Sequence, residues 1–146
     1  MDALIDAADA LDARLAALPL TGLSVSQLQR LVDHHELRRR RQPAVEHRLL
    51  AELQSRTSAI ALGAKNWAEV LTRRLRISKA EARRRLDEAQ QLGPRSALTG
   101  QPLAPQLAAL AAAQAAGTVN AEHVRIIRGF FDKLPHWVDA TTRHPG

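Results

Sequence analysis

Apolar positions recur at helical spacings along most of the chain, and no stretch alternates with the period of two that a strand requires. The clearest pattern runs over residues 66–92, where two short helical segments meet at Leu75-Arg76-Ile77-Ser78. Each segment begins with a capping box, in which Asn or Ser is followed three residues later by Glu. In the second segment Ala82, Leu86 and Ala89 share a face, so we expect that face to be buried. The pattern predicts a helix-turn-helix-like pair at residues 66–92.

Further helices are predicted on both sides of this pair, which makes the fold class all-α with six or seven helices. They cover residues 2–18, residues 24–41, residues 44–62 with an apolar stripe at Val45, Leu49, Leu53 and Ile60, residues 105–116, and a last helix that Asn120 caps and Pro135 closes, with Val124, Ile127 and Phe131 on one face. Pro43 predicts a stop or kink between the second and third of these helices, because proline cannot donate to the helix ladder. Residues 93–105 are rich in proline and glycine, which predicts a defined loop without a regular element.

The length of 146 residues fits a single helical domain, which we place at residues 1–138. The helix and turn of residues 1–22 are a candidate extension of it, and residues 139–146 are a polar tail that we expect to be frayed. Leucines at positions 4, 11, 15 and 18 share a face of the first helix. That face packs onto the rest of the domain or forms a homodimer.

Charge is distributed unevenly. Residues 1–37 carry two basic and six acidic side chains (net −4), residues 38–100 carry fifteen and six (net +9), and residues 101–146 carry four and three (net +1). A basic middle segment favours an anionic partner, although it also suits docking against the acidic first helix. Arg38 to Arg41 suggest phosphate contact, but cations near a helix C-terminus also complement the helix dipole.

The second helix of the 66–92 pair has a basic exposed side, as docking in the major groove requires. The candidate nucleic-acid-binding residues are Arg73, Arg74, Arg76, Lys79, Arg83, Arg84 and Arg85. The competing interpretation is that the triplet is engaged within the helix, because acidic residues lie four positions away and such pairs are ordinary surface stabilisers. These pairs are Glu81 with Arg85, Arg83 with Asp87, and Arg84 with Glu88.

Other function classes find no support in the sequence. The chain has no cysteine, no glycine-rich phosphate loop and no nucleophile motif, and its six histidines are scattered, so we expect no catalytic residue, no metal, no cofactor and no small-molecule substrate. An acidic N-terminus argues against a secretory signal, and no apolar run reaches the ~18–20 residues of a membrane span. We therefore expect a cytoplasmic protein without membrane contact.

Several segments together resemble the N-terminal half of the actinobacterial 13E12 repeat family. They are Leu75-Arg76-Ile77-Ser78, Glu81-Ala82, Arg84-Arg85, Leu92-Gly93-Pro94-Arg95, Ala97-Leu98-Thr99-Gly100, Pro102-Leu103-Ala104-Pro105, Glu122-His123-Val124 and Ile127-Arg128. That half is a helical domain of unknown function that usually precedes an HNH endonuclease domain. The resemblance implies association with mobile elements or prophages and double-stranded DNA as the partner. The chain ends at His144-Pro145-Gly146, before the nuclease half would begin, so we expect the HNH domain and its activity to be absent from it.

The leading hypothesis is therefore a non-catalytic, helical DNA-binding module that targets an attached nuclease to duplex DNA. In it Lys79, Arg83, Arg84 and Arg85 contact phosphates or base edges, and Arg73, Arg74 and Arg76 contact the DNA backbone. The alternative hypotheses are a protein-interaction or dimerisation module, which uses the leucines of residues 4–18 and the alanine-rich helix, and a truncated copy without function.

Overall fold

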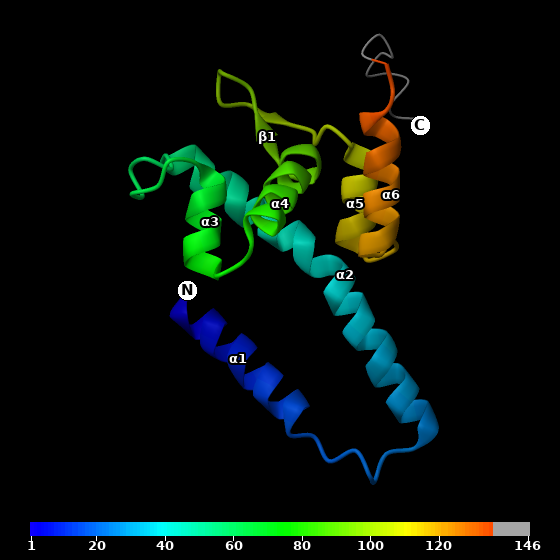
Figure 1. The fold of residues 1–146 in the computed structure, drawn as a ribbon. Helices are drawn as coiled ribbons and strands as arrows, with labels where there is room; N and C mark the ends of the chain where they lie inside the picture. The colour runs from blue at the N-terminus through cyan, green and yellow to red at the C-terminus, as the bar shows by residue number, and fades with distance from the viewer. Residues whose placement is uncertain (136–146) are drawn as a thin grey trace. The chain divides into compact units, whose positions relative to one another are not determined.

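The computed structural model describes residues 1–135 and contains six helices and one short β-hairpin in that range (Figure 1). The elements are α1 (Asp2–Ala16), α2 (Val25–Arg56), α3 (Trp67–Leu75), α4 (Lys79–Leu92), β1 (Arg95–Ser96), β2 (Pro102–Leu103), α5 (Ala108–Ala116) and α6 (Ala121–Asp132). The all-α prediction is confirmed. The predicted tail at residues 139–146 lies outside the described residues.

The chain divides into two compact units, Met1–Glu36 and Leu37–Gly146, and the boundary falls within α2. The first unit holds α1 and the start of α2. The second holds the rest of α2 and all later elements. The prediction of one domain over residues 1–138 stays a prediction.

Helix α2 corrects the prediction that a helix stops at Pro43 and that separate helices cover residues 24–41 and 44–62. The helix does not stop there, because Pro43 lies inside a continuous helix of 32 residues. An interior proline costs about 3 kcal/mol and one backbone hydrogen bond, so packing on both sides of it has to outweigh that cost. Leu37 packs near Gly117 on one side, and His47 and Leu50 are buried on the other. The helix ends at Arg56 rather than at residue 62, and a turn ending at Gly63 (φ +77°) follows.

The predicted stripe of α2 does not face the core of the second unit. Val45, Leu49 and Leu53 are 54%, 66% and 37% exposed, while His47 and Leu50 of the same helix are buried. The apolar periodicity of this helix therefore marks a surface rather than the packing face, and it misses the buried histidine.

Three apolar clusters lie in the described part of the second unit; the small one joins α3 to the turn before it through Ala59, Ala64 and Val70, and the other two join the helices to one another. One of these two joins α2, α3 and α4: Leu50 and Leu71 pack with Ala68, Ala82 and Ala89, and Ala82 is completely buried. The predicted inner face of α4 is thus confirmed at Ala82 and Ala89, with Leu86 partly buried against the same cluster. The other cluster joins α4, α5 and α6 through Leu92, Leu107, Leu110 and Val124, with Ile127 and Phe131 against it, so the predicted face of α6 is also confirmed.

The segment between α4 and α5 contains a regular element where a loop alone was predicted. Strands β1 and β2 pair antiparallel, with Arg95 opposite Leu103 and Ser96 opposite Pro102. Two residues per strand are too few to produce an alternating pattern. Helix α5 then begins at Ala108 rather than at Pro105, and it lies beside α6 in the view of Figure 1.

Candidate nucleic-acid interface

The candidate interface is the α3–turn–α4 pair, and both of its helices begin at the predicted N-caps. The predicted return bonds of the capping boxes are not formed, because the Glu69 side chain accepts from the Lys65 N–H and the Glu81 side chain from Arg84 and Arg85. The Asn66 side chain accepts a hydrogen bond from the Glu69 N–H (2.9 Å), and the Ser78 side chain accepts one from the Glu81 N–H (3.1 Å). Each cap satisfies a backbone donor that would otherwise lack an acceptor in the first turn. The positions of both helices are therefore set by short-range sequence signals.

Between the helices, Arg76 adopts the left-handed conformation (φ +56°, ψ +41°) as the C-cap of α3. It is the only residue other than glycine with positive φ among residues 1–135. Glycine takes this conformation at little cost, whereas a residue with a Cβ atom is strained there by about 1 kcal/mol. An exposed arginine thus occupies the turn position where glycine would fold more easily.

Two arginines of the triplet are engaged by acidic side chains. Arg84 donates from Nε and Nη2 to the two carboxylate oxygens of Glu81 (2.8 Å each) and from Nη1 to Glu88 (2.9 Å). Arg85 donates from Nε to Glu81 (2.8 Å) and from Nη1 to Glu46 of α2 (3.0 Å). The predicted Glu81–Arg85 and Arg84–Glu88 pairs are therefore confirmed.

These contacts lower the pKa of Glu81, whose carboxylate lies between the two arginines. Hydrogen bonds from Arg84, and then from Arg85, lower the pKa of Glu81 to about 2. The same interactions raise the pKa values of both guanidinium groups. Glu81 is thus ionised at any pH near neutrality, and it holds both arginines on the surface of α4.

Arg73 is also paired. It donates from Nη1 to the carbonyl oxygen of Gly63 (3.0 Å), and its Nη2 lies 2.6 Å from Glu69. The pKa of Glu69 is lowered, chiefly by a hydrogen bond from the Lys65 N–H and further by the charge of Arg73. This arginine therefore ties α3 to the turn that precedes it.

The remaining four candidates are exposed, and we call them the unpaired cations: Arg74, Arg76, Lys79 and Arg83. None of their side chains makes a hydrogen bond or an ion pair within the described part of the chain. The predicted Arg83–Asp87 pair is accordingly not formed there, and this prediction is wrong. Lys79 and Arg83 are four residues apart and share one face of α4, and Arg74 and Arg76 end α3 just before it.

A buried carboxylate that the sequence did not single out anchors α4 from behind. Glu88 is 7% exposed, and its Oε1 accepts from Gln114 Nε2 (3.0 Å) and lies 3.4 Å from His47 Nε2. Its Oε2 lies 3.5 Å from Arg128 Nη1, besides the bond from Arg84. Burial alone would raise the pKa of Glu88, but the contacts with His47 and Gln114 outweigh it and hold the pKa below its usual range. One side chain thereby links α4 to α2, α5 and α6.

Two arginines of the run in α2, Arg40 and Arg41, have a structural role. Arg41 Nε donates to the Ala116 carbonyl oxygen (3.3 Å), and Arg40 Nη1 donates to that of Gly117 (3.5 Å). Both acceptors lie at the C-terminal end of α5, where the carbonyl groups lack partners in the helix and the dipole favours cations. A Cβ atom on Gly117 would collide with Leu37 Cδ1, so glycine permits this close approach.

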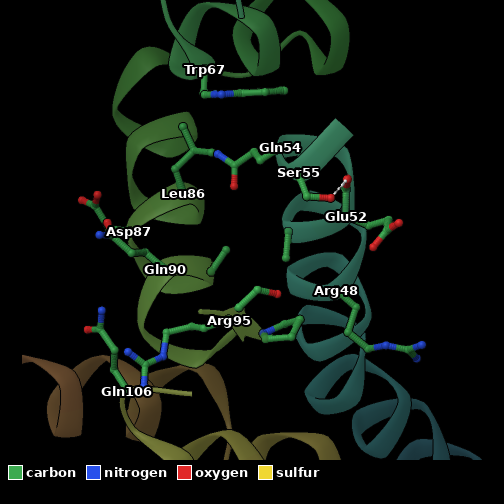
Figure 2. A pocket seen from close by; sticks show the side chains of 14 residues that line it. Arg48, Glu52, Gln54, Ser55, Trp67, Leu86, Asp87, Gln90, Arg95 and Gln106 are labelled. Atoms are coloured by element: carbon green, nitrogen blue, oxygen red, sulfur yellow. Dashed lines mark hydrogen bonds between the residues drawn. The ribbon is translucent and has the colours of Figure 1, made fainter. Parts of the chain in front are cut away.

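A groove of about 660 Å³ runs between α2 and α4 (Figure 2). Trp67 lies at one end of it, and Arg95 and Gln106 lie at the other. Its two arginines, Arg48 and Arg95, are matched by two carboxylates, Glu52 and Asp87. Because these charges balance, the groove does not extend the basic surface of the unpaired cations.

Residues 1–135 contain neither a metal-binding cluster nor a membrane-spanning helix. No group of three or more histidine, aspartate or glutamate side chains is arranged to hold a metal ion within those residues. No helix in that range is both long and apolar enough to cross a membrane.

The fold and these contacts define an all-helical protein whose second unit contains a helix-turn-helix-like pair. Its sequence matches the family model described as "Domain of unknown function (DUF222)" over residues 29–145, so the chain belongs to that family. No solved structure matches the chain.

Mycobacterial relatives, each named as an uncharacterized protein, match most of the chain. The chain is 42% identical over 129 residues to protein MT1160 of Mycobacterium tuberculosis (strain CDC 1551 / Oshkosh), and the match covers 88% of the chain and 30% of the relative. It is 42% identical over 131 residues to Rv3466 of M. tuberculosis (strain ATCC 25618 / H37Rv), at 88% and 59% coverage. To Rv1945 of that strain it is 39% identical over 143 residues, at 98% and 31%. The chain thus spans about 30% of the length of MT1160 and Rv1945.

Proposed function

We propose that this domain binds duplex DNA without catalysing a reaction, and that the α3–turn–α4 pair is the contact surface. The observation that carries the proposal is the group of unpaired cations, which adds four positive charges to one short segment, none of them in an ion pair among residues 1–135. Cations that phosphates can reach supply most of the affinity of a protein for DNA. Paired side chains are less available for that role.

The arrangement divides the seven candidate residues by role. The unpaired cations contact phosphates or base edges, and Lys79 and Arg83 approach from the exposed face of α4. Arg73, Arg84 and Arg85 act through position, because their bonds to carboxylates and to the Gly63 carbonyl hold the two helices in place. Joined to an HNH nuclease region of the 13E12 type, the module would target that nuclease to DNA, and the greater length of the relatives leaves room for such a region in them.

A binding assay with two matched variants tests the proposal. Arg83→Ala removes an unpaired cation of α4, whereas Arg125→Ala removes an exposed arginine of α6, and the net charge changes equally in both. With a fluorescently labelled random-sequence duplex at low salt, we expect Arg83→Ala to raise Kd several-fold and Arg125→Ala to leave it nearly unchanged. If both variants weaken binding equally, net charge alone is responsible and the proposed surface is wrong. If the unsubstituted chain does not bind, DNA binding by this domain is wrong.

A protein-interaction module is the second candidate, and one observation favours it. No residue of α1 is buried, and Leu4, Leu11 and Leu15 on its apolar face are at least 37% exposed. The alanine-rich α5, by contrast, uses Leu110 and Gln114 for packing within the second unit.

A further inference from the structure

Large exposed apolar side chains are concentrated in the first 62 residues. Those in α1 and α2 include Leu4, Ile5, Leu11, Leu15, Val25, Val32, Val45, Leu49 and Leu53. None of residues 1–36 is buried. A unit of 36 residues without a buried side chain has no hydrophobic core of its own, so it has to pack against a further surface to be stable. Large exposed apolar patches usually mark such surfaces.

Two of these surfaces have opposite charge. Helix α1 carries four aspartates and one arginine, net −3. The segment of α2 from residue 38 to residue 56 carries six arginines and two glutamates, net +4. This segment presents Val45, Leu49 and Leu53 at four-residue spacing on one face, which we call the α2 stripe. An acidic amphipathic helix and a basic apolar stripe thus occur in one chain.

We propose that two copies of this chain associate, with α1 of each copy packed on the α2 stripe of the other. The arrangement is reciprocal, as in a two-fold dimer, because each copy contributes both surfaces. The stripe from Val45 to Leu53 extends over about 12 Å, so a helix of 15 residues, which extends over about 22 Å, is long enough to cover it.

The area required also favours reciprocity. Stable interfaces bury about 800 Å² on each partner, which one stripe of three side chains does not supply. Two symmetric contacts double the buried area. The inference is independent of DNA binding, because the stripe is made of residues other than the unpaired cations.

The mass of the chain in solution is the first test, with Leu49→Glu as the variant and Leu98→Glu as its control. Leu49 is 66% exposed, and Leu98 is fully exposed at the tip of the β-hairpin, so neither substitution removes a core side chain. By light scattering over about two orders of magnitude in concentration, we expect twice 16.0 kDa for the unsubstituted chain and for Leu98→Glu, and 16.0 kDa for Leu49→Glu. A monomeric unsubstituted chain overturns the proposal, as does a dimeric Leu49→Glu variant.

Disulfide trapping then tests which surfaces meet. The chain contains no cysteine, so a single substitution introduces the only thiol. Leu11→Cys and Leu49→Cys chains are mixed with oxidised glutathione, which accepts the two electrons as two thiols become one disulfide. We expect a mixed Leu11→Cys/Leu49→Cys adduct, because each position is central on its proposed contact face, and facing positions of packed helices bring Cα atoms within the ~4.4–6.8 Å of a disulfide. A Leu98→Cys chain mixed with the Leu11→Cys chain should not give such an adduct. Equal yields in the two mixtures overturn the proposed contact.

Discussion

Glu81 holds Arg84 through both carboxylate oxygens, with Oε2 accepting from Nε and Oε1 from Nη2, each at 2.8 Å. The same Oε1 accepts from Arg85. Two of three consecutive arginines are thereby fixed on the surface of α4, and the first, Arg83, remains exposed without a partner among residues 1–135. Adjacent residues of one type therefore have different roles.

The arginines of the triplet should differ in how much they contribute to the free energy of unfolding. Arg85→Ala removes bonds to Glu81 and Glu46 and with them the link between α4 and α2, so we expect it to lower the free energy of unfolding by about 1 kcal/mol. Arg83→Ala should change that free energy by less than about 0.5 kcal/mol, because no hydrogen bond or ion pair is lost. Urea denaturation of both variants measures the difference. Equal destabilisation would mean that Arg83 has a structural partner.

Substitution of Arg76 by glycine should change stability and DNA binding in opposite directions. Arg76→Gly relieves the left-handed strain, so we expect the free energy of unfolding to rise by about 1 kcal/mol, while loss of the cation weakens DNA binding. Arg76→Ala is the matched control, because it removes the same charge and keeps a Cβ atom. It should weaken binding equally without the gain in stability. A glycine variant that binds DNA as tightly as the unsubstituted chain would exclude Arg76 from the interface.

Glu88 should be the most sensitive polar position in the second unit. Glu88→Ala leaves His47, Gln114 and Arg128 without their shared acceptor, and we expect a loss of about 3–5 kcal/mol, as for other broken buried pairs. The neighbouring Asp87→Ala, at an exposed position, should cost less than about 0.5 kcal/mol. Thermal and urea melts compare the two. Similar melting of both variants would contradict the role assigned to Glu88.

Acid should destabilise the protein through protonation of Glu81. The pKa of Glu81 is about 2 in the folded chain and 4.5 without its partners, so the native state binds fewer protons than the unfolded state between these values. The stabilisation is complete above about pH 4.5 and is lost as the pH falls toward 2. In Glu81→Gln this part of the loss should disappear. Urea midpoints measured across that pH range test the prediction, and identical pH profiles for the two proteins would contradict it.

Local features of this fold were predictable from the sequence. Asn66, Ser78 and Asn120 cap their helices as expected, because each side chain accepts from the backbone N–H three residues later. Ser24 and Gln27 form a complete capping box in the same way. The Glu81–Arg85 and Arg84–Glu88 pairs followed from helical spacing for the same reason.

Features that depend on contacts between elements were missed. Helix α2 continues through Pro43 because packing on both sides of it stabilises the helix, which no local signal shows. The burial of Glu88 could not be predicted from its position along α4. Its partners His47, Gln114 and Arg128 come from three other helices, so no local pattern shows them. Which arginines are unpaired was likewise undetermined, since Arg83 and Arg84 each have an acidic residue four positions away and only Arg84 uses it.

The most direct test of DNA binding by the unpaired cations is a salt titration of duplex affinity. For the unsubstituted chain we expect log affinity to fall linearly with log salt, at a slope of about −0.9 for each phosphate contact and thus about −3 to −4 for four cations. The variant with Arg74, Arg76, Lys79 and Arg83 all changed to alanine should bind weakly, with a slope near zero. A steep slope that this variant retains, or no binding of the unsubstituted chain at low salt, would contradict DNA binding through these four residues.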